Sequence, residues 1–176
     1  MGFEGRGSNI TLIGMPGAGK STLGIVLAKK IGYRFVDTDL LIQEGAQCLL
    51  SDIIEQKGVE GFISVENGIL AGLSCERHVI ATGGSAVYGE QAMENLRRLG
   101  PVLFIDISLP EVKTRIHTDL LTRGVVIREG STLEDLYNER HPLYERYADL
   151  TVHTDGMHTL DAVELLRSEL EKAGVI

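Results

Sequence analysis

The sequence predicts an α/β fold in which a parallel β-sheet forms the middle of three layers, with helices on both faces. Short apolar runs typical of strands alternate with longer helical stretches along the whole chain, and this order is typical of parallel sheets. The run over residues 102–107 is nearly all apolar, as expected of a strand that is buried on both faces. A chain of 176 residues is long enough for one domain with a sizeable core, so we expect a single domain over residues 1–176.

Five short apolar runs are predicted to form the strands of this sheet. Glycine, proline or polar residues bound these runs, as is usual at strand ends. The predicted strands are residues 9–13, 34–36, 78–82, 102–107 and 150–153.

The helices of the first half are predicted from apolar spacing and from the residues that end them. The first helix ends at Gly32, a residue suited to a left-handed cap. Gly45 is expected to break the second helix, and Ser51 or Asp52 is expected to cap a third that runs to Gly58. A longer amphipathic helix follows. These helices are predicted over residues 20–31, 40–44, 51–58 and 59–73.

Capping signatures locate the helices of the second half. Ser-x-x-Glu motifs that begin at Ser108 and Ser131 each predict a helix start, and Pro142 is expected to interrupt the second of these helices. Residues 118–130 between them are polar and lack helical periodicity, so we predict a mobile lid there. The helices of this half are predicted over residues 90–99, 109–117, 131–147 and 159–173.

Composition excludes several classes of protein. The formal net charge of −8 argues against a broad surface for nucleic acid or for an anionic membrane, and no apolar run approaches the length of a membrane span. The two cysteines form no C-x-x-C pair, which argues against a disulfide framework or a zinc site and favours a cytoplasmic location. We expect a monomer, with residues 1–8 as a flexible leader.

The glycine-rich loop that follows the first strand has the pattern of a phosphate-binding site. Its sequence is G-x-x-x-x-G-K-S, set between a strand and a helix. Glycines let the backbone fold around an anion, and the helix that follows directs its positive end toward that anion. A lysine here contacts the β- and γ-phosphates, and the serine hydroxyl is a ligand of Mg²⁺. The residues expected to bind the nucleotide phosphates are Gly14, Gly17, Ala18, Gly19, Lys20, Ser21 and Thr22.

Two further polar stretches follow predicted strands and are expected at the same edge of the sheet, where ligands bind. Asp37 and Asp39 follow the second strand, and Gly83-Gly84-Ser85 follows the third. Two carboxylates at this place suit a kinase that acts on an alcohol, because one can hold Mg²⁺ through water and the other can orient the hydroxyl. The alternatives are a helix cap for the aspartates and a simple tight turn for the glycines.

Taken together, these motifs resemble those of the shikimate kinase family over almost the whole chain. The later motifs are specific through their order and spacing rather than one by one. The matching stretches are Gly14 to Thr22, Asp37-Thr38-Asp39, Gly61-Phe62 with Glu66, Ala81-Thr82-Gly83-Gly84 and Asn138 to Tyr144. The resemblance implies a P-loop kinase fold with strand order 2-3-1-4-5, a closing lid, ATP as cosubstrate, Mg²⁺ as cofactor and a step of aromatic amino acid biosynthesis.

The resemblance also implies a role for individual residues. Asp37 would hold Mg²⁺ through water, and Asp39 would position the acceptor hydroxyl. Arg140 would bind the carboxylate of the substrate, while Arg123 would reach the phosphates from the lid and Arg115 would stack on adenine. Gly83 and Gly84 would approach the substrate through their backbone. For each arginine the alternative is a solvated surface charge.

Three positions in the substrate half of the site depart from the family pattern. The family has an arginine, a principal anchor of the carboxylate of shikimate, where this chain has Ile63. Loss of such an anchor, at about 3 kcal/mol, would weaken binding about a hundredfold. A third glycine is replaced by Ser85, and Gly124 stands where the family has a proline after the lid arginine.

These departures leave two interpretations open. Either a neighbouring base such as Lys57, Arg77 or Arg128 restores the missing charge, or the substrate specificity has changed. The first hypothesis is therefore that the protein is an ATP-dependent kinase of a small hydroxylated acid, with shikimate as the best single substrate. The alternatives are the same chemistry on another small hydroxylated metabolite, and a nucleotide-binding regulatory module without turnover.

Overall fold

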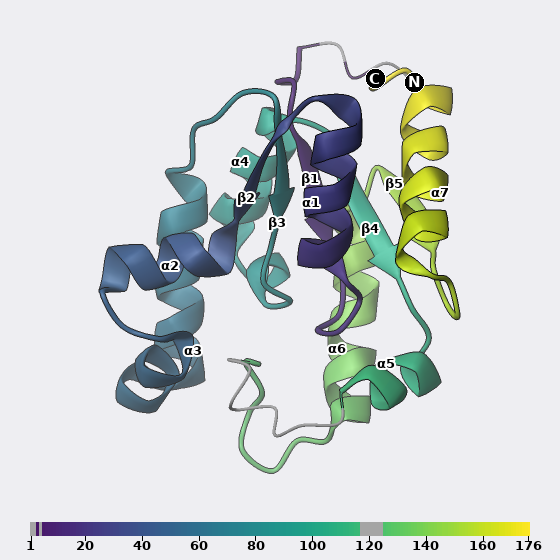
Figure 1. Cartoon of the computed structure of the whole chain (residues 1–176). Coiled ribbons are helices and arrows are strands. Elements are labelled where there is room, and N and C mark those ends of the chain that lie inside the picture. The colour runs from purple at the N-terminus through teal and green to yellow at the C-terminus, as the bar shows by residue number, and fades with distance from the viewer. Residues whose placement is uncertain (1–2, 4, 117–124) are drawn as a thin grey trace.

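The computed structural model describes residues 3, 5–116 and 125–176, and its centre is a five-stranded parallel sheet (Figure 1). The strand order is β2-β3-β1-β4-β5, which confirms the predicted order. Thr11 of the central strand pairs with Ile80 on one side and with Val102 on the other. The strands are β1 (Ile10–Ile13), β2 (Arg34–Asp37), β3 (His78–Ala81), β4 (Val102–Asp106) and β5 (Leu150–His153).

Helices cover both faces of this sheet. Helices α1 and α7 lie side by side on one face, and α4 and α6 lie on the other, with α2 and α3 beside the β2 edge (Figure 1). None of the described helices is long and apolar enough to cross a membrane. The helices are α1 (Lys20–Ile31), α2 (Thr38–Ala46), α3 (Leu50–Ala71), α4 (Glu90–Leu99), α5 (Leu109–Arg115), α6 (Leu133–Tyr147) and α7 (Thr159–Lys172), with a short 3₁₀ helix η1 (Ala86–Tyr88).

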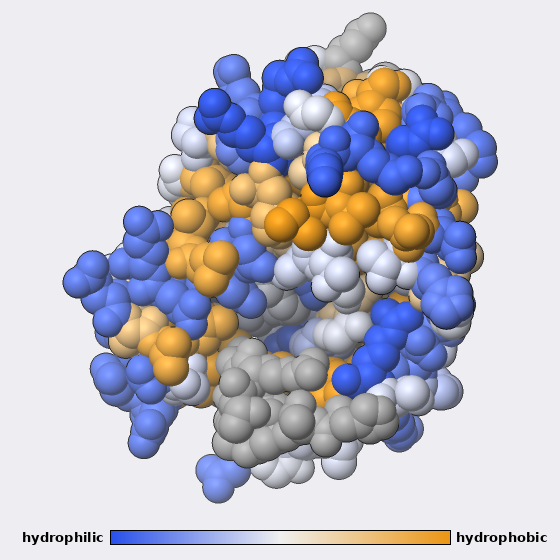
Figure 2. Space-filling model, viewed as in Figure 1, coloured by the Kyte–Doolittle hydropathy of each residue, from blue (hydrophilic) through white to orange (hydrophobic). Residues whose placement is uncertain are grey.

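The core follows from the position of the strands. β1 and β4 lie inside the sheet and are covered by helices on both faces, so every one of their residues is buried. A second, smaller apolar cluster lies between α2 and α3 and includes Ile42, Ile53 and Phe62. On the face shown in Figure 2, apolar side chains form a band across α1 and α7, and the surface is hollowed below this band.

Two predicted helix ends are confirmed by glycines with positive φ. Gly32 caps α1 at φ 70°. Gly58, at φ 69°, separates two helical stretches within α3, so the predicted break between them is correct. Positive φ is a conformation that glycine adopts without a steric penalty.

Three predicted helix boundaries are wrong. Gly45 does not end α2, which continues through it against α3 to Ala46 and is capped by Gln47 in the left-handed conformation. Pro142 does not interrupt α6, because the buried side chains on either side of it hold the helix in place. Asp52 does not cap α3 from within, since the helix begins at Leu50 and Asp52 instead accepts a hydrogen bond from the Leu49 N–H at 3.1 Å.

The cap of α6 also differs from the prediction. Thr132, not Ser131, is the N-cap, and its hydroxyl accepts a hydrogen bond from the Asp135 N–H at 3.1 Å. Asp135 returns a hydrogen bond to the Thr132 N–H, which completes a reciprocal capping box. The capping box therefore begins one residue later than the sequence predicts.

Residues near both chain ends lie at the end of the sheet where the strands begin (Figure 1). The Gly7 N–H donates to the Arg98 carbonyl at 2.9 Å, and the Arg6 guanidinium pairs with Asp149 at 2.6 Å. Part of the segment predicted as a flexible leader is therefore bonded to the body of the protein. Val175 lines the same surface groove as residues 7–9.

Candidate active site

The phosphate loop connects β1 to α1 in a shape that requires glycine. Gly14, Gly17 and Gly19 all have positive φ, and a Cβ on Gly14 would stand 2.5 Å from the Ile105 carbonyl oxygen. Lys20 begins α1, and its buried ammonium group donates to the carbonyls of Gly14 and Met15 at 2.8 and 2.9 Å. The loop therefore holds the ammonium group of Lys20 against two of its own carbonyls before any phosphate binds.

Burial lowers the pKa of Lys20 to about 8, although the negative charges of Asp39 and Asp37 act in the opposite direction. A lysine with this pKa is mostly protonated at neutral pH and loses its charge in mildly alkaline solution. Phosphate oxygens close to it would favour the charged form.

Asp37 connects the end of β2 with the phosphate loop. One of its carboxylate oxygens accepts a hydrogen bond from the Asp39 N–H at 3.0 Å and so caps α2. The other accepts from the Ser21 hydroxyl at 2.5 Å. The capping role and the phosphate-side role considered for Asp37 are therefore compatible. A hydroxyl and a carboxylate that converge in this way are hard oxygen ligands of the kind that Mg²⁺ takes, together with waters and substrate phosphates.

Asp39 stands in the first turn of α2 and lines the central cavity. Its pKa is raised to about 6, mainly because burial disfavours the carboxylate and also because Asp37 is close, while Lys20 lowers it. A carboxylate that is partly desolvated and still ionised at neutral pH is suited to accept a proton from an alcohol.

The two glycines after β3 leave room for side chains from three other elements. A Cβ on Gly83 would stand 2.8 Å from Asp39 Oδ1 and 2.7 Å from Glu66 Oε1. A Cβ on Gly84 would stand 2.9 Å from an Arg140 nitrogen. Any larger residue at either place would displace the charged groups of the site.

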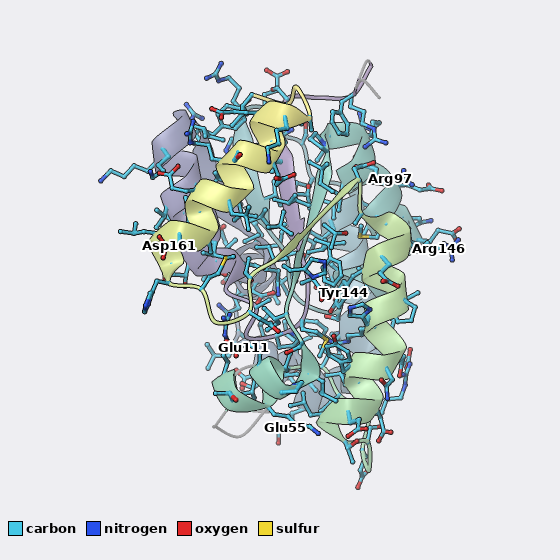
Figure 3. The ribbon with its side chains drawn as sticks, turned by 90° about the vertical axis from the view of Figure 1, so that its right-hand side faces the viewer. Glu55, Arg97, Glu111, Tyr144, Arg146 and Asp161 are labelled. Carbon is cyan, nitrogen blue, oxygen red and sulfur yellow. The ribbon has the colours of Figure 1, made fainter. Side chains whose placement is uncertain are left out.

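Arg140 projects from α6 and is 1% exposed. Its Nε donates to the Tyr88 hydroxyl at 3.1 Å, and its Nη2 donates to the Val126 carbonyl. Tyr144, one turn further along α6, donates its hydroxyl to the Gly84 carbonyl at 2.7 Å. Figure 3 shows Tyr144 pointing inward from α6, whereas Arg146 points away from the body of the protein.

These groups surround one cavity of about 360 Å³ at the edge of the sheet where the strands end. Ten of the residues predicted for the site line it, namely Gly17, Gly19, Lys20, Ser21, Thr22, Asp39, Gly83, Gly84, Ser85 and Arg140. Val125 and Val126, in the second half of the predicted lid, also line it.

Among the described residues, five that were predicted for the site do not line this cavity, namely Gly14, Ala18, Asp37, Ile63 and Arg115. Ile63 packs against the second apolar cluster between α2 and α3. Arg123 lies outside the described residues, as does most of the predicted lid. Arg128, considered as a substitute cation, forms ion pairs with Glu60 and Glu139 at 3.0 and 2.7 Å instead.

Arg115 lines a second cavity, of about 400 Å³, on the other side of Gly19 and Thr22. It is paired with Glu111 at 2.8 Å and donates to the Gly17 carbonyl at 3.4 Å. Thr154 lines the same cavity, and its buried hydroxyl has no hydrogen-bond partner among the described residues. A polar group of this kind is ready for a partner from a ligand.

Sequence reasoning singled out neither Tyr88 nor Thr154 and assigned no role to Glu66 or Tyr144. Glu66 and Tyr144 fall within motifs noted above, and their helical spacing from Phe62 and Arg140 indicates that they share a face with them. Tyr88 and Thr154 carry no such signal, because they reach the site only through the fold.

Comparison with known proteins gives one consistent family. The family model described as shikimate kinase matches residues 16–171. The shikimate kinase of Synechococcus sp. (strain RCC307) is 37% identical over 174 residues, covering 97% of this chain and 88% of that protein.

Solved structures give the same result. The alignment with the structure of shikimate kinase from Aquifex aeolicus covers 94% of this chain and 98% of that one, at 30% identity and with a TM-score of 0.81. Shikimate kinase from Acinetobacter baumannii, solved in complex with shikimate, covers 97% and 96% at 29% identity, with a TM-score of 0.79.

Proposed function

The chain belongs to the shikimate kinase family, and on that premise we propose that it transfers the γ-phosphoryl group of ATP to a hydroxyl of shikimate. We further propose that it does so as a cytoplasmic monomer. The observation that carries the proposal is the convergence of Lys20, Asp39 and Arg140 on one cavity of about 360 Å³. Such a transfer needs a cation that binds the phosphates, a base and a group that binds the carboxylate of the substrate. Lys20, Asp39 and Arg140 respectively can supply them.

The phosphate loop would bind ATP. Its glycines would let backbone N–H groups turn toward the phosphates. Lys20 would exchange its bonds to the Gly14 and Met15 carbonyls for bonds to the β- and γ-phosphates. The second cavity, beside Arg115 and Thr154, would take the adenine. Stacking on the Arg115 guanidinium and a hydrogen bond to the Thr154 hydroxyl are the contacts that these side chains can offer.

Ser21 and Asp37 would hold Mg²⁺, which fits the hard oxygen ligands that they place 2.5 Å apart. The ion would neutralise charge on the phosphates when bound. In the protein itself, Asp37 also caps α2 and thereby fixes the position of Asp39.

Asp39 would accept the proton of the attacking hydroxyl. Its pKa of about 6 leaves it ionised at neutral pH and makes it a stronger base than an exposed aspartate. Arg140 would bind the carboxylate of the acid, since its guanidinium is already buried and oriented by Tyr88 and Val126. The two contacts would hold the acceptor with its hydroxyl toward the phosphate loop.

The test is the formation of ADP from ATP and Mg²⁺ with shikimate as acceptor, beside a panel of hydroxy-amino acids and sugar acids. Saturable ADP release with shikimate, together with a phosphate monoester in the product by ³¹P NMR, is the expected result. Release with another acid alone would favour the alternative acceptor that Ile63 raises. No ADP release with any acceptor of the panel, with ATP still bound, would favour a regulatory module.

A further inference from the structure

Glu66 is a buried carboxylate that the proposed transfer does not use. It lies on α3, is 1% exposed and accepts a hydrogen bond from the Ser85 hydroxyl at 2.6 Å through one oxygen. Its other oxygen, Oε1, has no hydrogen-bond partner among the described residues. That oxygen and Asp39 Oδ1 both lie within 3 Å of the point where a Cβ on Gly83 would stand. Two carboxylates thus face the same part of the cavity wall.

Ser85 is the link between this carboxylate and the cavity. It lies directly after the two glycines and lines the cavity, whereas Glu66 does not line it. A hydroxyl has one hydrogen to donate and two lone pairs that accept. Because Glu66 takes the hydrogen, the Ser85 oxygen can act toward the cavity only as an acceptor.

Because the Ser85 oxygen can only accept, the charges around the cavity determine which group of the bound acid lies beside it. Arg140 presents a buried cation near Gly84, and Ser85, the next residue along the chain, presents an acceptor backed by a carboxylate. A carboxylate of the substrate is attracted to the first place and repelled from the second, while a hydroxyl can donate at the second. The two places therefore separate the polar groups of a hydroxylated acid.

We infer that the Glu66–Ser85 pair is a specificity-determining element that accepts a hydrogen bond from a non-reacting hydroxyl of the acceptor acid and so fixes its orientation against Asp39. This inference rests on the proposed kinase function and adds to it the residues that recognise a second hydroxyl of the substrate. Glu66 acts through Ser85 as a positioning residue. It is not a catalytic one.

The test is a cycle between enzyme variants and substrate analogues. Wild type and Ser85→Ala are compared on shikimate and on two deoxy analogues, each of which lacks one of the hydroxyls that is not phosphorylated. The assay runs at pH 8, because the pKa of Glu66 is raised by burial to about 7 and the carboxylate must be ionised. Ser64→Ala, an exposed serine on the same helix, is the matched control.

In wild type, we expect kcat/KM to fall about tenfold for one deoxy analogue, the size of a well-placed hydrogen bond. In Ser85→Ala, that same deletion should change kcat/KM less than twofold, while the control keeps the wild-type pattern. Equal losses in wild type and Ser85→Ala for both analogues would overturn the inference, since Ser85 would then only hold Glu66 in place.

Glu66→Gln provides a second test with the size of the side chain kept. Its amide can donate to Ser85 and release the serine hydrogen toward the cavity, so discrimination against the same deoxy analogue should shrink. Unchanged discrimination would overturn the role of the pair. Absence of turnover by wild type on shikimate would instead overturn the proposed function, and the inference with it.

Discussion

Replacing Asp39 by asparagine should inactivate the protein and stabilise it at the same time. In the folded chain the pKa of Asp39 is raised from its ordinary 3.8 to about 6, first by burial and then by Asp37. The carboxylate is therefore a charge that the fold holds at a cost, and asparagine keeps its shape without that charge. Without the base, phosphoryl transfer to the acceptor should fall about 10²–10⁴-fold.

The stabilisation follows from the size and sign of this pKa change. A rise of about two units corresponds to about 3 kcal/mol. Because the folded state binds the proton more tightly, wild type loses stability as the pH rises from about 4 to about 6, and the variant does not. The variant should therefore gain about 2–3 kcal/mol at pH 7.5, and only about a third of that at pH 4.5.

Urea unfolding at these two pH values measures the gain, and a coupled ADP assay measures the activity. Asp161→Asn is the matched control, because Asp161 also lies in the first turn of a helix but is exposed (Figure 3). We expect no gain from it. A free energy of unfolding for Asp39→Asn that equals wild type at both pH values would refute the stability argument, and full transfer activity would refute the role as base.

Three further predictions concern the rest of the site. ATP affinity should fall as the pH rises above about 8, the pKa of Lys20, by up to about tenfold per pH unit; calorimetry at pH 7 and pH 9 tests this, and equal affinities would contradict it. Ile63→Arg puts a cation three residues before Glu66 on α3 and should lower the KM for shikimate about tenfold, whereas an unchanged KM would mean that the new side chain does not reach the cavity. Tyr144→Phe removes the hydrogen bond to the Gly84 carbonyl and should cost about 1 kcal/mol of stability in urea unfolding; a smaller loss than 0.3 kcal/mol, on the order of the error of such a measurement, would show that the bond contributes nothing.

The positions of the strands and of the phosphate loop could be predicted from the sequence because both depend on local patterns, whereas the order of the strands in the sheet came from the family resemblance. An apolar run followed by G-x-x-x-x-G-K-S permits few other structures, and Gly32 and Gly58 mark helix ends through their own backbone preference. The predictions that Gly45 would end α2 and that Pro142 would interrupt α6 were wrong for a complementary reason. Local preference is weak where a helix is packed on a partner, and the packing of α2 and α6 overrides it.

The side-chain contacts around the cavity could be predicted less well from the sequence. Residue types and spacing identify Asp39 and Arg140, but no local pattern indicates that the Ser85 hydroxyl meets Glu66 from a different helix. The same holds for Tyr88, which meets Arg140 across the site. Such pairs form only when distant segments are folded together, and a single sequence carries no record of them.

The two ends of the described chain meet on the side of the sheet opposite the cavity, around a shared surface groove (Figure 1). This arrangement makes the protein a convenient host for engineering. A short linker between residues 5–9 and residues 173–176 would close the chain into a ring, and new ends could then be opened in an exposed loop. A fluorescent reporter attached at the old junction would stand clear of ATP and the acid, because the cavity lies at the other end of the strands.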